Sequence, residues 1–336
     1  MRFVPLLAAL VVSAAAARAA ACAGCSNPNL PQVLPGGAEP GAGRWSTSVS
    51  FSATRLRVVH ASECPDLGPE CATQPDARQV HDQTLALAEL RAFAEYGLNA
   101  GSTFQLQLPV KLIRSDITYR HPDGTRYPDD YVGIHHRDEM LAGLMDPWVT
   151  FRKGRTVGGW RLGLRAGLTL PLGRTEADPF AAGERGAAHQ HIQFGTGTFN
   201  PLLGADLVRT FGRTTMAGYA FAQVIPFENR HGFRAGDRVS AGAAVLRAFG
   251  AGRTGSLTFD VVHEEAERWH GVVQQDGNLG RTDLLAGAGV EVGTPVGPLT
   301  LAVRTPVWQR VVGGQVSYPA IATVLWQPAR PSSEGR

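Results

Sequence analysis

The chain has 336 residues, of which 40 are glycine and only 18% are charged, and its formal net charge is +3. After the N-terminal region no stretch approaches the roughly 18 consecutive apolar residues of a membrane-spanning helix, which excludes a membrane helix bundle. The mild charge and the lack of a dense basic run argue against a nucleic-acid partner.

The first residues predict an export signal. Arg2 supplies a positive charge, residues 3–17 form a largely apolar run, and small residues follow. We predict that residues 1–21 are a signal peptide and that residues 22–43, rich in Pro, Gly, Ala and Asn, form an irregular periplasmic lead. The last residues, 328–336, are expected to form a disordered tail.

The four cysteines would then face an oxidising compartment. Cys64 and Cys71 bracket a short loop, and we predict a disulfide between them. Cys22 and Cys25 form a C-x-x-C pair without the histidine that a haem attachment motif requires. A redox pair, half of a metal site, a disulfide and a lipid anchor on Cys22 all stay open for this pair.

Residues 44–327 alternate apolar with polar side chains, and the clearest segments are 103–112, 160–170 and 256–261. A period of two is typical of strands that have lipid on one face and water on the other. The polar face consists of Gly, Thr, Ser, Gln and isolated charges, as expected of a polar lumen. Two segments are ambiguous. Residues 84–98 would make a passable helix, but we predict a strand there because the strand count requires one. Residues 191–211 are longer than a strand needs, so part of this segment can belong to the preceding loop.

Short and long connections follow one another in turn. The short ones fall at 99–101, 153–158, 212–214, 250–254 and 294–297, and the longer ones at 61–82, 120–138, 174–190, 227–236, 267–281 and 312–315. Five short turns and six longer loops predict an all-β fold, a closed antiparallel transmembrane β-barrel of about twelve strands. Its place would be the outer membrane of a Gram-negative bacterium, with the short turns in the periplasm and the longer loops outside.

Five tryptophans fall at or near predicted strand ends. This position suits an aromatic girdle at the two membrane interfaces. The residues are Trp45, Trp148, Trp160, Trp308 and Trp326.

Three segments resemble a known family. Ala188–Gly204 contains Gly-Thr-Gly-Thr-Phe-Asn-Pro, Ala142–Trp148 contains Gly-Leu-Met-Asp-Pro, and Gly163–Gly173 ends in Pro-Leu-Gly. Together they resemble the outer-membrane transporter-like barrels described as the MetA-pathway phenol-degradation type. The resemblance implies an outer-membrane barrel and passage of small, often hydrophobic, compounds. It implies no catalytic residues.

Polar residues of two kinds are candidates for a site. The predicted lumen charges are of mixed sign, which suggests a plugged interior or a weakly selective pore. They are Lys111, Arg161, Arg165, Asp206, Arg238, Asp260, Asp283, Glu291 and Arg304. All ten histidines fall in or beside predicted external loops, and His135, His136, His189 and His191 have spacings that can bind zinc or copper.

We therefore predict a passive, porin-like channel for a small, hydrophobic or aromatic solute, with membrane lipid and the solute as its partners. The alternative is a non-conducting surface barrel whose His-rich loops bind metal or a partner. No cofactor other than that zinc or copper is expected. A G-x-S-x-G nucleophile motif is missing, and the sequence predicts no enzyme.

Overall fold

The computed structural model describes residues 29–30, 40–63, 78–131, 133, 137–189, 191–250, 252–274, 277–311 and 317–328. The predicted signal peptide and the four cysteines lie outside the described residues, so the disulfide and the C-x-x-C pair stay predictions. Among the described residues, no helix is long and apolar enough to cross a membrane.

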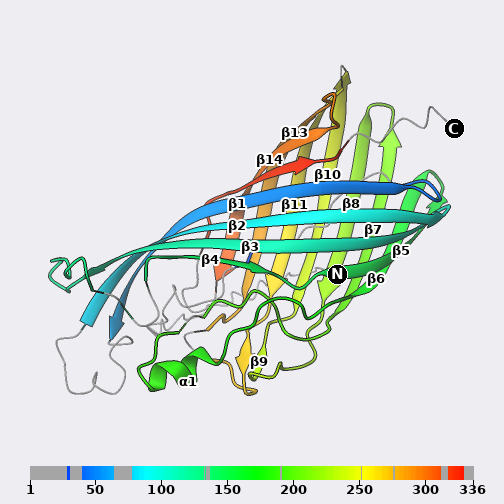
Figure 1. Cartoon of the computed structure of the whole chain (residues 1–336). Helices are drawn as coiled ribbons and strands as arrows, with labels where there is room; N and C mark the ends of the chain where they lie inside the picture. The colour runs from blue at the N-terminus through cyan, green and yellow to red at the C-terminus, as the bar shows by residue number, and fades with distance from the viewer. Residues whose placement is uncertain are drawn as a thin grey trace, which may run out of the picture.

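One antiparallel sheet makes up nearly all of the described chain (Figure 1). Its strands are β1 (Trp45–Glu63), β2 (Arg78–Asn99), β3 (Ser102–Arg120), β4 (Glu139–Leu144), β5 (Trp148–Val157), β6 (Trp160–Thr169), β7 (Pro201–Phe211), β8 (Thr214–Gln223), β10 (Arg238–Gly250), β11 (Arg253–Glu264), β13 (Arg281–Val292), β14 (Leu299–Val311) and β15 (Ile321–Trp326). A two-residue pair, β9 (Phe233–Arg234) with β12 (Arg268–Trp269), and one short helix, α1 (Pro179–Glu184), lie in the loops.

The sheet closes on itself because β1 pairs with β2 on one side and with β15 on the other. β4 and β5 lie in line along β3, and together they form one strand interrupted at residues 145–147. The barrel therefore has twelve strand positions, and the predicted closed antiparallel barrel is confirmed. In Figure 1 the long loops and α1 gather at one end of the barrel and the short turns at the other.

The two ambiguous segments resolve differently. Residues 84–98 belong to β2, which pairs along most of its length with both β1 and β3, so the predicted strand is confirmed. Residues 191–200 are not a strand, because β7 begins only at Pro201. The third loop is therefore longer than 174–190, and its last part turns inward, with Phe194 and Asn200 buried.

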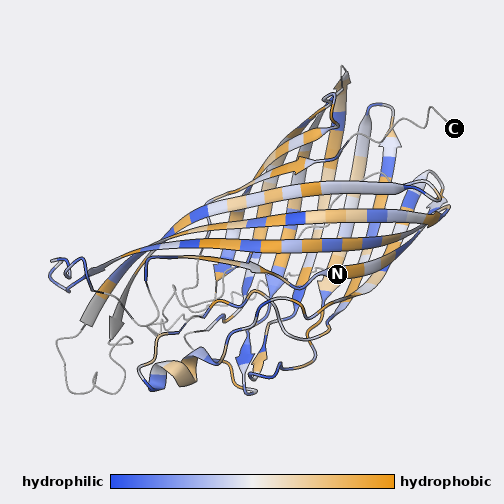
Figure 2. Ribbon diagram, in the orientation of Figure 1, coloured by the Kyte–Doolittle hydropathy of each residue, from blue (hydrophilic) through white to orange (hydrophobic). Residues whose placement is uncertain are grey.

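The outer wall is apolar, and Figure 2 shows hydrophobic and hydrophilic residues alternating along β1, β2 and β3. Large side chains such as Leu164, Leu257 and Phe259 are exposed on it. So wide an exposed apolar surface is typical of contact with lipid. Trp45, Trp308 and Trp326 are exposed near strand ends, but Trp148 is buried and stacks on Phe221, so its placement in the aromatic girdle is wrong.

The half of the lumen nearer the long loops is filled by an apolar core. One of its residues is Leu30, which is 4% exposed and belongs to the segment predicted as a periplasmic lead. The buried members of this core are Leu30, Leu56, Leu85, Leu87, Ile113, Val262, Leu285, Tyr318 and Ile321. The other half of the lumen holds a cavity lined by charged and hydroxyl side chains.

Candidate functional site

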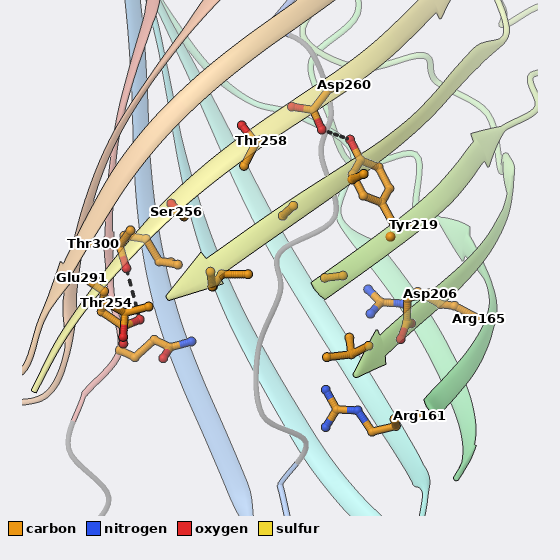
Figure 3. Close-up of a pocket in the computed structure, with 18 of the residues that line it drawn as sticks. Arg161, Arg165, Asp206, Tyr219, Thr254, Ser256, Thr258, Asp260, Glu291 and Thr300 are labelled. Atoms are coloured by element: carbon orange, nitrogen blue, oxygen red, sulfur yellow. Dashed lines mark hydrogen bonds between the residues drawn. The ribbon is translucent and has the colours of Figure 1, made fainter. Parts of the chain in front are cut away.

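The candidate site is a cavity of about 270 Å³ inside the barrel. Thr103, Arg161, Thr254 and Thr300 line it, and each lies within two residues of the start of its strand, next to a short turn. The cavity therefore occupies the half of the lumen nearer the short turns. Figure 3 shows charged and hydroxyl side chains pointing into this space from different parts of the wall.

One part of the wall, on β5, β6 and β7, is rich in arginine. Arg152 Nε and Nη2 donate to the two carboxylate oxygens of Asp206 at 2.8 and 2.5 Å, a bidentate charge-assisted pair. This pair reaches across β6, where Gly163 faces Asp206 in register. A Cβ at Gly163 would lie 2.3 Å from Arg152 Nη2, so this position must lack a side chain for the pair to form.

The other two arginines of this wall, Arg165 and Arg161, make fewer hydrogen bonds than Arg152 does. Arg165 Nη1 donates to Gln105 Oε1 at 2.6 Å, and Gln105 Nε2 donates to Glu95 at 2.8 Å. Arg161 makes no hydrogen bond or ion pair with any described residue, and its Nε is buried. Arg161 is therefore a cation at the cavity surface whose hydrogen-bonding capacity is unused within the described protein.

The opposite wall, on β11, β13 and β14, carries hydroxyls and carboxylates. Tyr219 from β8 donates to Asp260 at 2.9 Å, and Arg304 Nε lies 3.6 Å from the other oxygen of Asp260. Thr300 donates to Glu291 at 3.4 Å. The remaining hydroxyls of this wall belong to Thr254, Ser256 and Thr258.

Glycines again allow these contacts. Gly242 on β10 lies in register between Tyr219 on β8 and Asp260 on β11, and a Cβ there would lie 2.2 Å from Asp260 Oδ1. Gly287 on β13 likewise lies between Thr258 and Arg304. Part of the high glycine content thus has a packing reason: polar side chains cross the strand that separates them.

A polar layer next to the apolar core separates the cavity from the long loops. Lys111, with no exposed surface, donates to Asn29 Oδ1 at 2.9 Å and to the Gln193 carbonyl at 3.3 Å. Asn29 donates to Glu264 at 3.3 Å, and the backbone amide of Leu30 donates to buried Glu89 at 3.4 Å. The cavities that touch Asn29 measure only about 20 and 30 Å³, so this layer closes the lumen.

The nine predicted lumen charges thus occupy two zones. Six of them line the cavity: Arg161, Arg165, Asp206, Asp260, Glu291 and Arg304. Lys111, Arg238 and Asp283 lie in the closed half. Arg238 bonds Glu264 at 3.3 Å, and Asp283 accepts from Arg281 at 2.7 Å and from Tyr318 at 2.6 Å.

Sequence reasoning missed Arg152, Glu95 and Glu89. The latter two lie in the segment that also fitted a helix, where a strand interpretation places residues 89, 91 and 95 on one face. The signal was therefore present in the alternation of β2.

The three segments that carried the family resemblance meet at one carboxylate. Asp146 Oδ1 accepts from the Gly173 amide at 3.0 Å, and Oδ2 accepts from the amide and hydroxyl of Thr196 at 2.7 and 2.6 Å. Asn200 Nδ2 donates to Thr196 at 2.7 Å. A Cβ at Gly195 would lie 2.5 Å from Asp146 Oδ1, which explains a glycine at this position. The network ties the third loop to the interruption between β4 and β5.

The structure places two of the four predicted metal ligands. The rings of His189 and His191 lie edge to face at 5.1 Å in the third loop. His135 and His136 are outside the described residues. Within the described part of the chain, no group of three or more His, Cys, Asp and Glu side chains is arranged to hold a metal ion.

No family model matches the chain, and no curated protein matches it. Among solved structures, it is similar to the COG4313 outer membrane channel from Pseudomonas putida F1, with 14% identity over 88% of this chain and 100% of that chain and a TM-score of 0.55. It also matches the TodX deltaS2S3 mutant monoaromatic hydrocarbon channel (9% identity, 86% and 91% covered, TM-score 0.41) and OmpT of Vibrio cholerae in its trimer form (10%, 85% and 99%, 0.34). Of these three, the first exceeds a TM-score of 0.5, and it shows a shared barrel fold. The barrel fold that the resemblance to outer-membrane transporter-like barrels implies is therefore confirmed.

Proposed function

We propose that the chain is an outer-membrane channel that passes small solutes through its lumen. The observation that carries the proposal is the cavity of about 270 Å³, lined by charges and hydroxyls, inside a closed barrel whose outer wall is apolar. A polar interior behind a lipid-facing wall is typical of barrels that conduct. The barrel similar to this chain in Pseudomonas putida F1 is described as a channel, which supports the same function here.

Passage requires the layer around Asn29 and Leu30 to move. Its described hydrogen bonds to Glu264 and Glu89 measure 3.3 and 3.4 Å, which is longer than the usual range of about 2.7–3.2 Å, and Lys111 donates to Asn29 at 2.9 Å. Leu30 contributes the burial of one apolar side chain, which is worth about 1.5–3 kcal/mol. Because this layer closes the lumen at rest, we expect a channel that conducts only in brief events, when the layer is displaced.

Planar-bilayer recording of the refolded chain tests this function. Leu30→Asp places a charge in the apolar core, so we expect it to expel this segment and raise the open fraction. Leu30→Met keeps the volume and polarity and should behave like the wild type. Silence of both the wild type and Leu30→Asp, with each shown to be folded by its heat-dependent electrophoretic mobility, would contradict the proposal.

A metal-binding surface is the second candidate, and the proximity of His189 to His191 favours it. Two imidazoles on one loop suit zinc or copper. We expect either ion to raise the thermal midpoint of the refolded barrel and the double variant His189→Asn, His191→Asn to remove that shift. No shift with either ion would refute this function. The expected lack of enzyme activity stays a prediction of the sequence.

A further inference from the structure

Apolar and charged residues of the cavity follow one another along a single row of the sheet. Strand pairing places Arg161 opposite Val208, Val208 opposite Ala217, Ala217 opposite Ala244, and Ala244 opposite Thr258. All five line the cavity. The row therefore runs from a cation on β6, over three apolar positions on β7, β8 and β10, to a hydroxyl on β11.

The dimensions of this row set the size of a molecule that fits it. Neighbouring strands lie about 4.8 Å apart, so Val208 and Ala244, two strands apart, span about 10 Å of wall. Ala217 and Ala244 have short side chains, so they leave space above them. An apolar body of up to about eight carbon atoms fits within this length at roughly 1.3 Å of chain per carbon, a spacing close to the backbone geometry of extended chains.

Arg161 supplies the polar end of the site. Its guanidinium presents donors in a planar fork that matches a carboxylate, and it makes no hydrogen bond or ion pair with a described residue. The charge on this side of the cavity favours a single negative charge, because three arginines of the wall lie near two carboxylates, Asp206 on β7 and Glu95 on the neighbouring strand β2. These residues leave one excess positive charge, which a monoanion neutralises and a dianion does not match.

The opposite wall does not offer the equivalent site for a cation. Glu291 lies in register between Thr254 and Thr300, so hydroxyls and not apolar side chains flank it. Figure 3 shows this separation, with Arg161 and Arg165 on one side of the cavity and Glu291, Thr254 and Thr300 on the other. An amphipathic anion, and not an amphipathic cation, fits the arrangement.

We propose that the cavity binds small amphipathic monocarboxylates, with the carboxylate on Arg161 and the apolar body along Val208, Ala217 and Ala244. The inference rests on the proposed channel function, because it names the class of solute held in the lumen. The neutral amide of the same carbon skeleton should bind less well, since it cannot form a charge-assisted pair with Arg161.

Isothermal titration calorimetry of the whole refolded chain with hexanoate and hexanamide tests the site. We expect hexanoate to bind at least about tenfold more tightly, the effect of one charge-assisted hydrogen bond. Arg161→Gln should remove that preference. Arg155→Gln, on the same hairpin but exposed and outside the cavity, is the matched control and should leave it unchanged.

A second variant tests the apolar surface independently of the charge. Ala217→Leu should weaken hexanoate and hexanamide alike and leave acetate binding unchanged, because acetate has no body to place there. Equal affinity of the folded wild type for hexanoate and hexanamide, or an unchanged preference in folded Arg161→Gln, would overturn the inference.

The outcomes also separate this inference from the channel function. Steady conductance without a hexanoate preference leaves the channel and removes the monocarboxylate site. Hexanoate binding through Arg161 in a barrel that is silent in bilayers keeps the site and removes the channel.

Discussion

Replacement of Gly242 by alanine should break the hydrogen bond between Tyr219 and Asp260. The new Cβ would lie 2.2 Å from Asp260 Oδ1 and 2.5 Å from Tyr219 Cε1, so the two side chains must separate. Asp260 is 2% exposed, and the lost bond involves a carboxylate. Bonds of this kind contribute about 1.5–3 kcal/mol, so we expect the free energy of unfolding to fall by about 2 kcal/mol.

A double-mutant cycle distinguishes this cause from a general effect of alanine in a strand. Tyr219→Leu removes both the hydroxyl and Cε1, so Gly242→Ala should cost little in that background, with a coupling energy of about 1.5 kcal/mol. Gly218→Ala is the control, because its Cβ would come no closer than 3.6 Å to an atom of a neighbouring strand, and it should change stability by less than about 0.5 kcal/mol.

Guanidinium unfolding of the barrel in lipid vesicles, followed by tryptophan fluorescence, measures all four free energies of the cycle. If Gly242→Ala lowers the free energy of unfolding equally with Tyr and with Leu at position 219, the glycine is not required for the hydrogen bond between Tyr219 and Asp260, and the explanation is refuted.

Two further predictions concern the loop side of the barrel. Asp146→Ala leaves the backbone amides of Gly173 and Thr196 without their acceptor and removes the shorter hydrogen bond of the Thr196 hydroxyl, and we expect a loss of about 3 kcal/mol in the same unfolding assay; a loss under about 1 kcal/mol would contradict this. Burial raises the pKa of Glu267, in the loop after β11, from 4.5 to about 7. The folded state therefore holds this proton more tightly, and its stabilising contribution is full below about pH 4.5 and is lost as the pH rises through 7. Glu267→Gln should reduce the loss of stability between pH 5 and pH 8, and an unchanged pH profile would show that another group is responsible.

The sequence predicted the half of the barrel near the short turns better than the half near the loops. On β6 and β11 every second residue faces lipid, so the alternation directly indicates a strand. On β2, Leu85 and Leu87 point into the lumen and pack against the core around Leu30, and both faces of the strand are then partly apolar. A pattern with apolar residues on both faces loses the period of two, which is why a helix seemed possible there.

The sequence predicts which charged residues face the lumen, but it does not predict which of them form ion pairs with one another. Alternation places Arg165 and Asp206 on the inner face, but which arginine reaches Asp206 depends on the register between β5, β6 and β7. That register makes Arg152 the partner through the gap at Gly163, and leaves Arg161 beside Val208. A period of two carries no information about the offset between strands.

The position of the cavity follows from the size of the inward residues. A barrel of twelve strands is narrow enough for its own side chains to obstruct it. Where the inward positions hold Leu, Tyr, Lys and Glu, as around Leu30 and Lys111, the lumen is closed. Where they hold small residues, as at Ala217, Ala244 and Ser256, space remains. Replacing small residues there should therefore change what the cavity holds, whereas replacing Leu30 should change whether the cavity connects to the outside.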